Sequence, residues 1–279
     1  MKIDAGEVCM ITKNWIDIRK AAEDGRKLLF PMGVIEEHGP HLPLGSDIFW
    51  SQKMCEMVRE ELKKSGEDVL IVPAYYWGIN HSTDAFPGSF TLTKETMKLV
   101  LLEIFENIKK FGFKEVYCFN YHGDVHHIHT IVEVIQKANS DLGLNVKLVL
   151  ESMDLKLHGW KGDESFLLVS EPPYPYEWFM EEIPSERGLL DIHGGTFETA
   201  VLNYFYPEYV DLELAKKLDS SSLTKEGLQK WLAGGEATKE VVPLGYAGNP
   251  SGYDMVGKHV EEMIALQVTD IARRIQGVI

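Results

Sequence analysis

Short apolar runs alternate with amphipathic helical patterns through the first half of the sequence, and this alternation constrains the fold more than any other feature. The strand-like runs and the helical segments between them are, in chain order, residues 28–35, 48–62, 69–72, 97–108, 115–119, 129–138 and 146–150. Repeated strand–helix units build parallel sheets whose crossover helices cover the sheet. We therefore expect an α/β fold of three layers, with a mostly parallel sheet and helices on both faces. Ligands of such sheets bind at the carboxyl ends of the strands.

The alternation lapses between residues 152 and 190, where aromatic residues such as Trp160 and those from Tyr174 to Phe179 lie among acidic ones. This composition is typical of a long excursion that packs on its own aromatic side chains. We expect either an arm at a subunit contact or a lid over the site. Helical periodicity resumes at residues 198–206 and 260–275. Without repeats or a linker, residues 1–279 are predicted to form a single domain.

Net charge limits the kinds of partner that the protein can bind, and cysteine content indicates the compartment in which it works. The formal charge of −15 disfavours nucleic acid and anionic membranes, because long-range repulsion opposes both encounters. A small neutral or cationic substrate, or one held by metal, fits better. The three scattered cysteines, Cys9, Cys55 and Cys118, are expected to be reduced thiols in a cytoplasmic protein. Neither a signal peptide nor a membrane span is expected.

Potential metal ligands are concentrated directly after the first predicted strand. Residues 36–47 hold Glu36, His38 and Asp47 on a loop stiffened by prolines. Glu36 and His38 are two residues apart, so in extended chain they point to the same side. Carboxylates and imidazoles are ligands that Zn²⁺, Mn²⁺ or Fe²⁺ accept. The alternative is a polar surface turn in which Asp47 only caps the following helix.

Two further clusters follow later strands or open a helix. His122 and Asp124 repeat the two-residue spacing after the third strand, so they would meet the first cluster if both strands end at one sheet edge. Nearby histidines at 126, 127 and 129 lie where a helix begins and cannot all face one point. In residues 191–200, glycines allow close backbone approach beside His193, and Glu198 falls at a helix start, where the dipole favours a carboxylate.

These segments resemble signatures of the creatininase (creatinine amidohydrolase) family. The segment at residues 36–47 resembles Glu-x-His-Gly-x-His-Leu-Pro-x-x-x-Asp, which is highly specific. The others, in the family's order, are residues 86–89 with Phe-Pro-Gly-Thr, 120–123 with the ends of Asn-Gly-His-Gly, and 193–200 with His-Ala-Gly-x-x-Glu-Thr-Ser. The resemblance implies a creatininase-like fold, two divalent metal ions per chain and a homo-oligomer, often a hexamer.

The resemblance also implies roles for individual residues. Asp47 would bridge the ions, with Glu36 and His122 on one side and His38 on the other. Asp124 and Glu198 both fall on acids that relatives use as ligands, and either could complete the sphere. His193 falls on a histidine that binds substrate or transfers a proton; Asp124 and Glu198 are further candidates for the proton transfer.

The predicted activity is metal-dependent hydrolysis of a non-peptide or cyclic C–N amide bond of a small molecule. A bound metal lowers the pKa of water from 15.7 to about 7 and so supplies hydroxide near neutral pH. The sequence departs from the family before residues 86–89, where Ser82 and Thr83 replace a common Glu-His pair, so formamides and small peptides also stay open as substrates. A non-catalytic metal- or ligand-binding member is the main alternative. A serine hydrolase or a nucleotide-binding protein is disfavoured, because the sequence has neither a Gly-x-Ser-x-Gly elbow nor a phosphate-binding glycine motif at a strand end.

Overall fold

A single parallel sheet organises the chain. The computed structural model describes residues 9–175, 178, 190–221 and 223–278. The strands follow the spatial order β2-β1-β3-β4-β5, and every neighbouring pair is parallel. Their bounds are β1 Leu28–Met32, β2 Leu70–Ile71, β3 Glu115–Asn120, β4 Asn145–Glu151 and β5 Leu167–Ser170. The parallel α/β fold expected from the sequence is thus confirmed.

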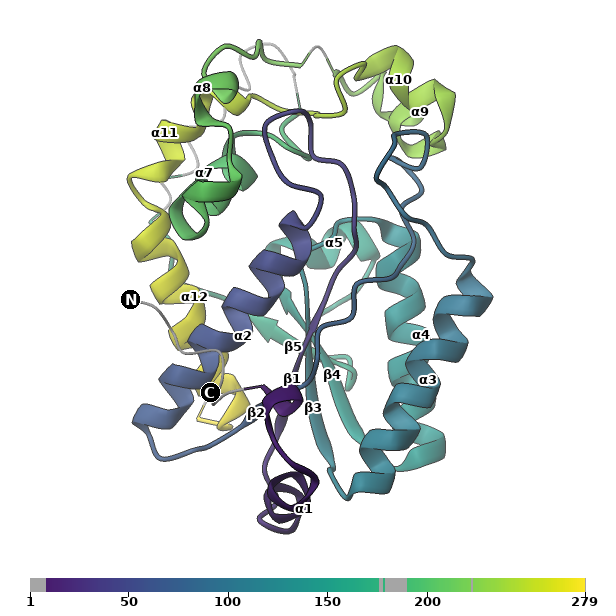
Figure 1. The fold of residues 1–279 in the computed structure, drawn as a ribbon, viewed down its shortest axis with the longest axis vertical. Helices are drawn as coiled ribbons and strands as arrows, with labels where there is room; N and C mark the ends of the chain where they lie inside the picture. The colour runs from purple at the N-terminus through teal and green to yellow at the C-terminus, as the bar shows by residue number, and fades with distance from the viewer. Residues whose placement is uncertain (1–8, 176–177, 179–189, 222, 279) are drawn as a thin grey trace.

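Helices cover both faces of the sheet (Figure 1). α2 and α12 pack on one face, and α3 and α4 lie on the other. The longer helices are α1 Trp15–Glu23, α2 Ser46–Lys64, α3 Lys94–Phe111, α4 Val125–Leu142, α7 Thr196–Phe205 and α12 Val260–Ile275. Shorter helices are α5 Leu155–His158, α8 Leu212–Ala215, α9 Leu228–Ala233, α10 Glu236–Val241 and α11 Tyr253–Gly257. Short 3₁₀ turns are η1 Met10–Thr12, η2 Ser152–Asp154, η4 Pro207–Tyr209 and η5 Pro250–Gly252.

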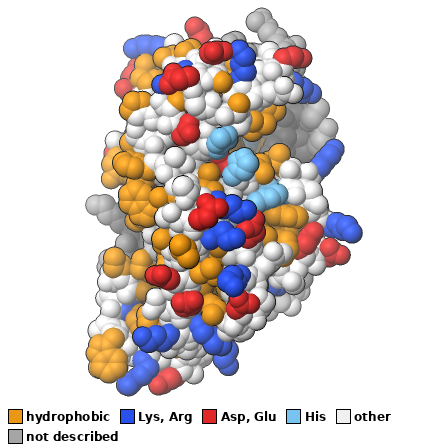
Figure 2. Space-filling view, turned by 90° about the vertical axis from the view of Figure 1, so that its right-hand side faces the viewer, with side chains coloured by type: hydrophobic (Ala, Val, Ile, Leu, Met, Phe, Trp, Pro, Cys, Tyr) orange, Lys and Arg blue, Asp and Glu red, His pale blue; other side chains and the backbone are white. Residues whose placement is uncertain are grey.

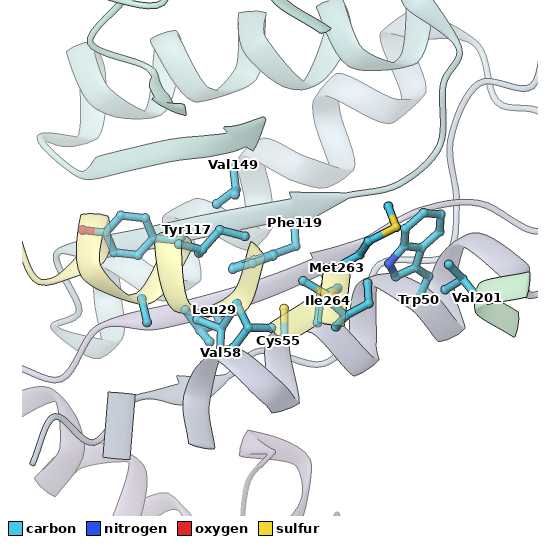
Figure 3. Close-up of a cluster of buried hydrophobic side chains, with 14 of the residues drawn as sticks. Leu29, Trp50, Cys55, Val58, Tyr117, Phe119, Val149, Val201, Met263 and Ile264 are labelled. Atoms are coloured by element: carbon cyan, nitrogen blue, oxygen red, sulfur yellow. The ribbon is translucent and has the colours of Figure 1, made fainter. Parts of the chain in front are cut away.

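Successive strand residues point to opposite faces and are buried in two different cores. Leu29 and Phe119 pack with α2 and α12, as Figure 3 shows for one of these cores. Phe30 and Cys118 pack on the other face with α3 and α4. Strands buried on both faces read as continuous apolar runs, which explains why they were visible in the sequence. Cys55 and Cys118 are free thiols buried in these two cores.

Helix starts follow local capping chemistry. Thr93 caps α3 through its side-chain oxygen, which accepts a hydrogen bond from the Thr96 N–H. α4 begins earlier than predicted, at Val125, because the Asp124 carboxylate accepts the first free backbone N–H groups. The N-cap of α2 is Gly45 rather than Asp47, which lies inside the first turn. The proposal that Asp47 caps this helix is therefore wrong, and its buried side chain is available for other contacts.

The segment at residues 152–190 is only partly the excursion expected. It contains α5 and then β5, an edge strand that pairs with β4. A run of only four strand residues is too short to show a clear pattern in the sequence. Tyr176, Phe179 and the rest of residues 179–189 lie outside the described residues, so their proposed role as an arm or lid stays a prediction. No helix in the described part of the chain is both long and apolar enough to cross a bilayer.

The strand order places a topological switch point between β1 and β3. From β1 the chain moves to β2 on one side and then returns, through α3, to β3 on the other. Loops leaving the carboxyl ends of β1 and β3 diverge to opposite faces and open a crevice where ligands of such sheets bind. The β1 loop carries residues 33–45 and the β3 loop carries residues 121–124. These loops contain the first two clusters singled out in the sequence.

Candidate metal centre

The sheet edge brings four predicted ligands together from three segments. Glu36 and His38 follow β1, His122 follows β3, and Asp47 is the second residue of α2. β1 and β3 pair in register to their last residues, Met32 opposite Asn120, so both loops leave at the same level. All four side chains are at least 95% buried. A buried cluster of this kind is stable only when its charges are compensated.

The two carboxylate oxygens of Asp47 face two different imidazoles. Oδ1 lies 3.2 Å from Nε2 of His38, and Oδ2 lies 3.3 Å from Nδ1 of His122. The same His122 nitrogen lies 2.9 Å from Oε2 of Glu36. Asp47 therefore stands between two sets of candidate ligand atoms.

Backbone carbonyls fix which nitrogen of each ring faces the carboxylates. His38 Nδ1 donates to the carbonyl of Glu36 at 3.0 Å, and His122 Nε2 donates to the carbonyl of Ile79 at 2.9 Å. In the neutral rings, His38 Nε2 and His122 Nδ1 then carry lone pairs directed at carboxylate oxygens. Such outer hydrogen bonds are typical of metal-ligating histidines, because they set the tautomer and orientation.

The resulting electrostatics call for positive charge between these atoms. Burial opposes protonation of His38, but the Asp47 carboxylate outweighs it and raises the His38 pKa to about 10. Burial would raise the Glu36 pKa, but the charges of His122 and His193 outweigh it and lower that pKa to about 2. The pKa of His122 is likewise raised, against burial, by Glu36 and Asp47. Protons or metal ions can supply this charge.

The donor atoms fit divalent cations. Among the described residues, three groups have ligand atoms within 4.8 Å of one another: Glu36, Asp47 and His122; His38, Asp47 and Glu198; and Glu36, His38 and His193. The first two share Asp47. With His122 neutral and its Nε2 donating to Ile79, the buried oxygens Glu36 Oε2 and Asp47 Oδ2 accept no hydrogen bond from the described residues. Carboxylate and imidazole ligands sharing one acid suit two Zn²⁺ or Mn²⁺ ions.

Glu198 reaches the cluster because a glycine turn brings α7 against the β1 loop. The Gly194 N–H donates to Glu198 Oε2 at 2.6 Å, and that oxygen lies 4.0 Å from His38 Nε2. Gly194 has a φ of +58°, and a Cβ there would meet the His38 carbonyl oxygen at 2.7 Å. Only glycine tolerates both the conformation and the approach. Burial raises the pKa of the Glu198 carboxyl.

His193 lies beside His38 at the edge of this cluster. The two ring centroids are 4.4 Å apart, and His193 Nε2 donates to the carbonyl of Glu37 at 2.6 Å. Nδ1 of the neutral ring is then left as the acceptor. Burial opposes protonation, but the Glu36 charge outweighs it and raises the His193 pKa to about 8. His193 is thus placed for either metal binding or proton transfer.

Asp124 is the predicted ligand that the structure does not bring into any of these groups. Its Oδ1 accepts from the backbone N–H groups of His126 and His127, and its Oδ2 accepts from that of His81. A carboxylate at a helix N-cap is stabilised by these donors and by the helix dipole. The spacing in the sequence could not separate this cap from a ligand.

The other histidines of the β3 loop lie apart from the cluster. His126 and His129 line a surface pocket with His81, Lys94 and Glu133. Figure 2 views the molecule from the right-hand side of Figure 1 and shows histidine side chains gathered on that surface beside lysines and acids. His127 is buried behind His122, with ring centroids 5.0 Å apart, and contacts Asn120. None of the three belongs to a metal-ligand group of the described residues.

Fold and site together define an α/β protein with a candidate two-ion centre at the switch point of a parallel sheet. The family model for creatininase, described as creatinine amidohydrolase, matches residues 12–275. The chain therefore belongs to the creatininase family, as its resemblance implied.

Known relatives agree with this assignment at low identity. A mycofactocin precursor peptide peptidase of Mycolicibacterium smegmatis is 26% identical over 117 residues, 42% of this chain and 47% of that protein. Creatinine amidohydrolase of Pseudomonas putida is 24% identical over 191 residues, 67% and 66% of the two chains. These matches thus cover about half to two thirds of each relative. A creatininase crystal structure shares the fold, with a TM-score of 0.69 and 20% identity over 97% of both chains.

Proposed function

We propose that this chain is a metal-dependent amidohydrolase that cleaves a C–N amide bond of a small molecule. One observation carries the proposal: the two oxygens of Asp47 face two separate imidazoles, each within a buried group of ligand atoms. Glu36 and His122 would hold one divalent ion, and His38 and Glu198 the other, with Asp47 shared. A pair of ions held there would lower the pKa of bound water and polarise the carbonyl under attack.

The protein's own groups supply orientation and proton transfer. The Glu36 and Ile79 carbonyls hold His38 and His122 in the tautomers that present a lone pair to the centre. The Glu37 carbonyl holds His193 by Nε2, so Nδ1 is the atom that accepts a proton and returns it to the departing nitrogen. A positioned general acid of this kind contributes about 10²–10⁴ in rate. We assign this step to His193 rather than to Asp124, whose oxygens are occupied by N–H groups.

Relatives indicate the range of metals and substrates. Solved creatininases of the same fold are described as a Zn–Zn type and as a Mn form, and one mutant is complexed with creatine. Curated relatives are a creatinine amidohydrolase and peptidases of a precursor peptide. We therefore propose Zn²⁺ or Mn²⁺, with Fe²⁺ also compatible with the ligands, and a small cyclic, formamide or peptide amide as substrate. Assembly into a homo-oligomer stays a prediction.

The test combines metal analysis with an amide screen. Metal-replete protein, dialysed against metal-free buffer, is expected to retain two equivalents and to release amine or formate from a member of an amide and lactam panel. Glu36→Gln and Glu198→Gln should each lose one equivalent, whereas Asp47→Asn should lose both and all turnover. Each variant is also checked for its fold by circular dichroism. Less than one equivalent in the folded wild type would refute the proposal, and two equivalents without any amide turnover would favour a non-catalytic metal-binding member.

A further inference from the structure

A cavity of about 280 Å³ lies beside the candidate metal centre, at the carboxyl ends of β3, β4 and β5. His122 and Gly123 form the wall nearest to the centre. Glu151, the last residue of β4, lines it on the side away from β1. The position next to a ligand of the centre makes this cavity a candidate for holding a remote part of the substrate.

The walls are largely aromatic and apolar. Trp50 stacks on Tyr121 with ring centroids 4.4 Å apart, and Phe197 packs against the same indole. Met153 and Leu157 also line the cavity and are 60% and 66% exposed, so they stand at its mouth. A flat or slender group can therefore enter and be covered on several sides.

The polar lining is acidic. Glu151 and Asp154 both line the cavity, and its lining among the described residues includes no lysine or arginine. Glu151 Oε1 accepts a hydrogen bond from Gln267, and Tyr174 also hydrogen-bonds to this carboxyl. Without a cation in the walls, an anionic guest would be repelled, whereas an N–H donor or a cation would be attracted.

Two buried polar atoms of the lining have no hydrogen-bond partner among the described residues. They are Nε1 of Trp50 and Nδ1 of His158, and each residue is 8% exposed. A buried polar group without a partner costs free energy, which a guest that bonds to it would recover. The cavity thus offers acceptors at its acids and a donor at the Trp50 indole.

The groups that surround Glu151 do not fully compensate the negative charge of its carboxylate. Burial, followed by the charge of Asp154, raises the pKa of Glu151 to about 7. The two neutral donors that contact it do not offset these effects. A guest carrying N–H groups or positive charge would stabilise the carboxylate, since hydrogen bonds to charged groups are the stronger ones.

We propose that this cavity binds the arm of the substrate remote from the scissile amide and selects an uncharged or cationic arm bearing N–H donors, with Glu151 as its acceptor. As a substrate subsite it rests on the proposed function. As a binding site it can be tested alone. Glu151 is then a specificity residue, which no segment of family resemblance singles out.

Binding is tested with three probes that share one ring: benzylammonium, benzyl alcohol and benzenesulfonate. They are titrated into the metal-loaded protein while the indole N–H resonance of Trp50, assigned with Trp50→Phe, is followed by NMR. Benzylammonium is expected to shift this resonance at the lowest concentration and benzenesulfonate to bind about tenfold or more weakly. An unmoved Trp50 resonance, or benzenesulfonate binding as tightly as benzylammonium, would overturn the proposal.

Two variants separate Glu151 from a general charge effect. Glu151→Gln should weaken benzylammonium binding about tenfold and benzyl alcohol binding by less than about threefold. Glu106→Gln, on the exposed face of α3, makes the same change of charge outside the cavity and should alter neither. Should Glu151→Gln fail to fold, Leu157→Lys places a cation at the exposed mouth and should reverse the preference towards benzenesulfonate. Unchanged affinities in both cavity variants would refute the role of Glu151.

Turnover tests the subsite separately. For any amide that the screen identifies, a derivative with an amino-terminated arm should have a lower KM than its carboxylate-terminated counterpart, and Glu151→Gln should abolish that difference while kcat changes less. Probe binding that depends on Glu151 in a protein without amide turnover would refute the proposed function and leave a binding site. If KM and kcat did not depend on the charge of the arm, the proposed subsite would be refuted and the proposed function would stand.

Discussion

Thr83 donates a hydrogen bond of 2.5 Å from its hydroxyl to Oε1 of Glu36, and both side chains are buried. The bond occupies one carboxylate oxygen and leaves Oε2 directed at His122. Thr83 thus holds Glu36 in the orientation that its proposed role as a metal ligand needs. Outer hydrogen bonds of this type typically change metal affinity by about 10–100-fold. The sequence pointed to Thr83 only as a departure from the family, where a Glu-His pair is common.

Thr83→Val is expected to weaken metal binding without dismantling the centre. The substitution keeps the shape of the side chain but removes the donor, so Glu36 Oε1 becomes a buried acceptor without a partner. We expect metal affinity at the Glu36 and His122 position to fall about 10–100-fold. Competition with a chromophoric chelator measures it. Thr130→Val is the matched control, because the Thr130 hydroxyl is buried but bonds to a helix carbonyl at His126. If the two variants bound metal with equal affinity, the Thr83 hydroxyl would have no role in supporting the metal centre.

Asp124 gives a second prediction, in which a helix cap is separated from a metal ligand. Asp124→Ser retains a side chain that caps helices well but cannot replace a carboxylate ligand. We expect Asp124→Ser, which keeps the helix cap but loses the acceptor for the His81 N–H, to keep two metal equivalents and to be more stable than Asp124→Ala by about 1 kcal/mol, while Asp124→Ala also keeps the metals. Urea unfolding and elemental analysis measure the two quantities. If Asp124→Ser lost one equivalent of metal, Asp124 would be identified as a metal ligand.

The sequence allowed the sheet and the approximate position of the centre to be predicted, because both depend on local patterns. Strands buried on two faces read as apolar runs, and ligands that follow β1 and β3 must meet if those strands are neighbours. The strand order itself depends on long-range pairing, so the switch point became visible only in the structure. β5 escaped prediction because its four residues carry too little pattern.

Individual roles were harder to predict than positions. Asp47 and Asp124 both precede or open a helix in the sequence, and either could have been a cap or a ligand. The structure places Asp47 two positions beyond the N-cap of α2, Gly45, and turns its side chain towards two histidines, whereas Asp124 accepts N–H groups at the start of α4. Glu151 and Gln267 are 116 residues apart and meet only because α12 packs against the end of the sheet.

The raised pKa of Glu151 predicts a pH-dependent contribution to stability. A carboxyl whose pKa is higher in the folded state stabilises the fold fully below the unfolded value, here about 4.5, and that contribution is lost as pH rises through about 7. The shift corresponds to about 3 kcal/mol at most. Wild type should therefore lose stability relative to Glu151→Gln between pH 4.5 and pH 8, as measured by urea unfolding at several pH values. A constant difference between the two proteins over this range would contradict the raised pKa.

His193 is predicted to act on protons rather than to hold metal. Its Nε2 is anchored on the Glu37 carbonyl. Its ligand atom lies within 4.8 Å of those of Glu36 and His38, but His38 already faces Asp47 at 3.2 Å and Glu36 already faces His122 at 2.9 Å. His193→Gln should therefore retain two metal equivalents and lower kcat about 10²–10⁴-fold with a smaller change in KM. His81→Gln, in the surface histidine group, serves as the control and should change neither quantity. A variant that loses an ion instead would identify His193 as a ligand, and the proton for the departing nitrogen would then have to come from Glu198, the remaining acid at the exposed edge of the cluster.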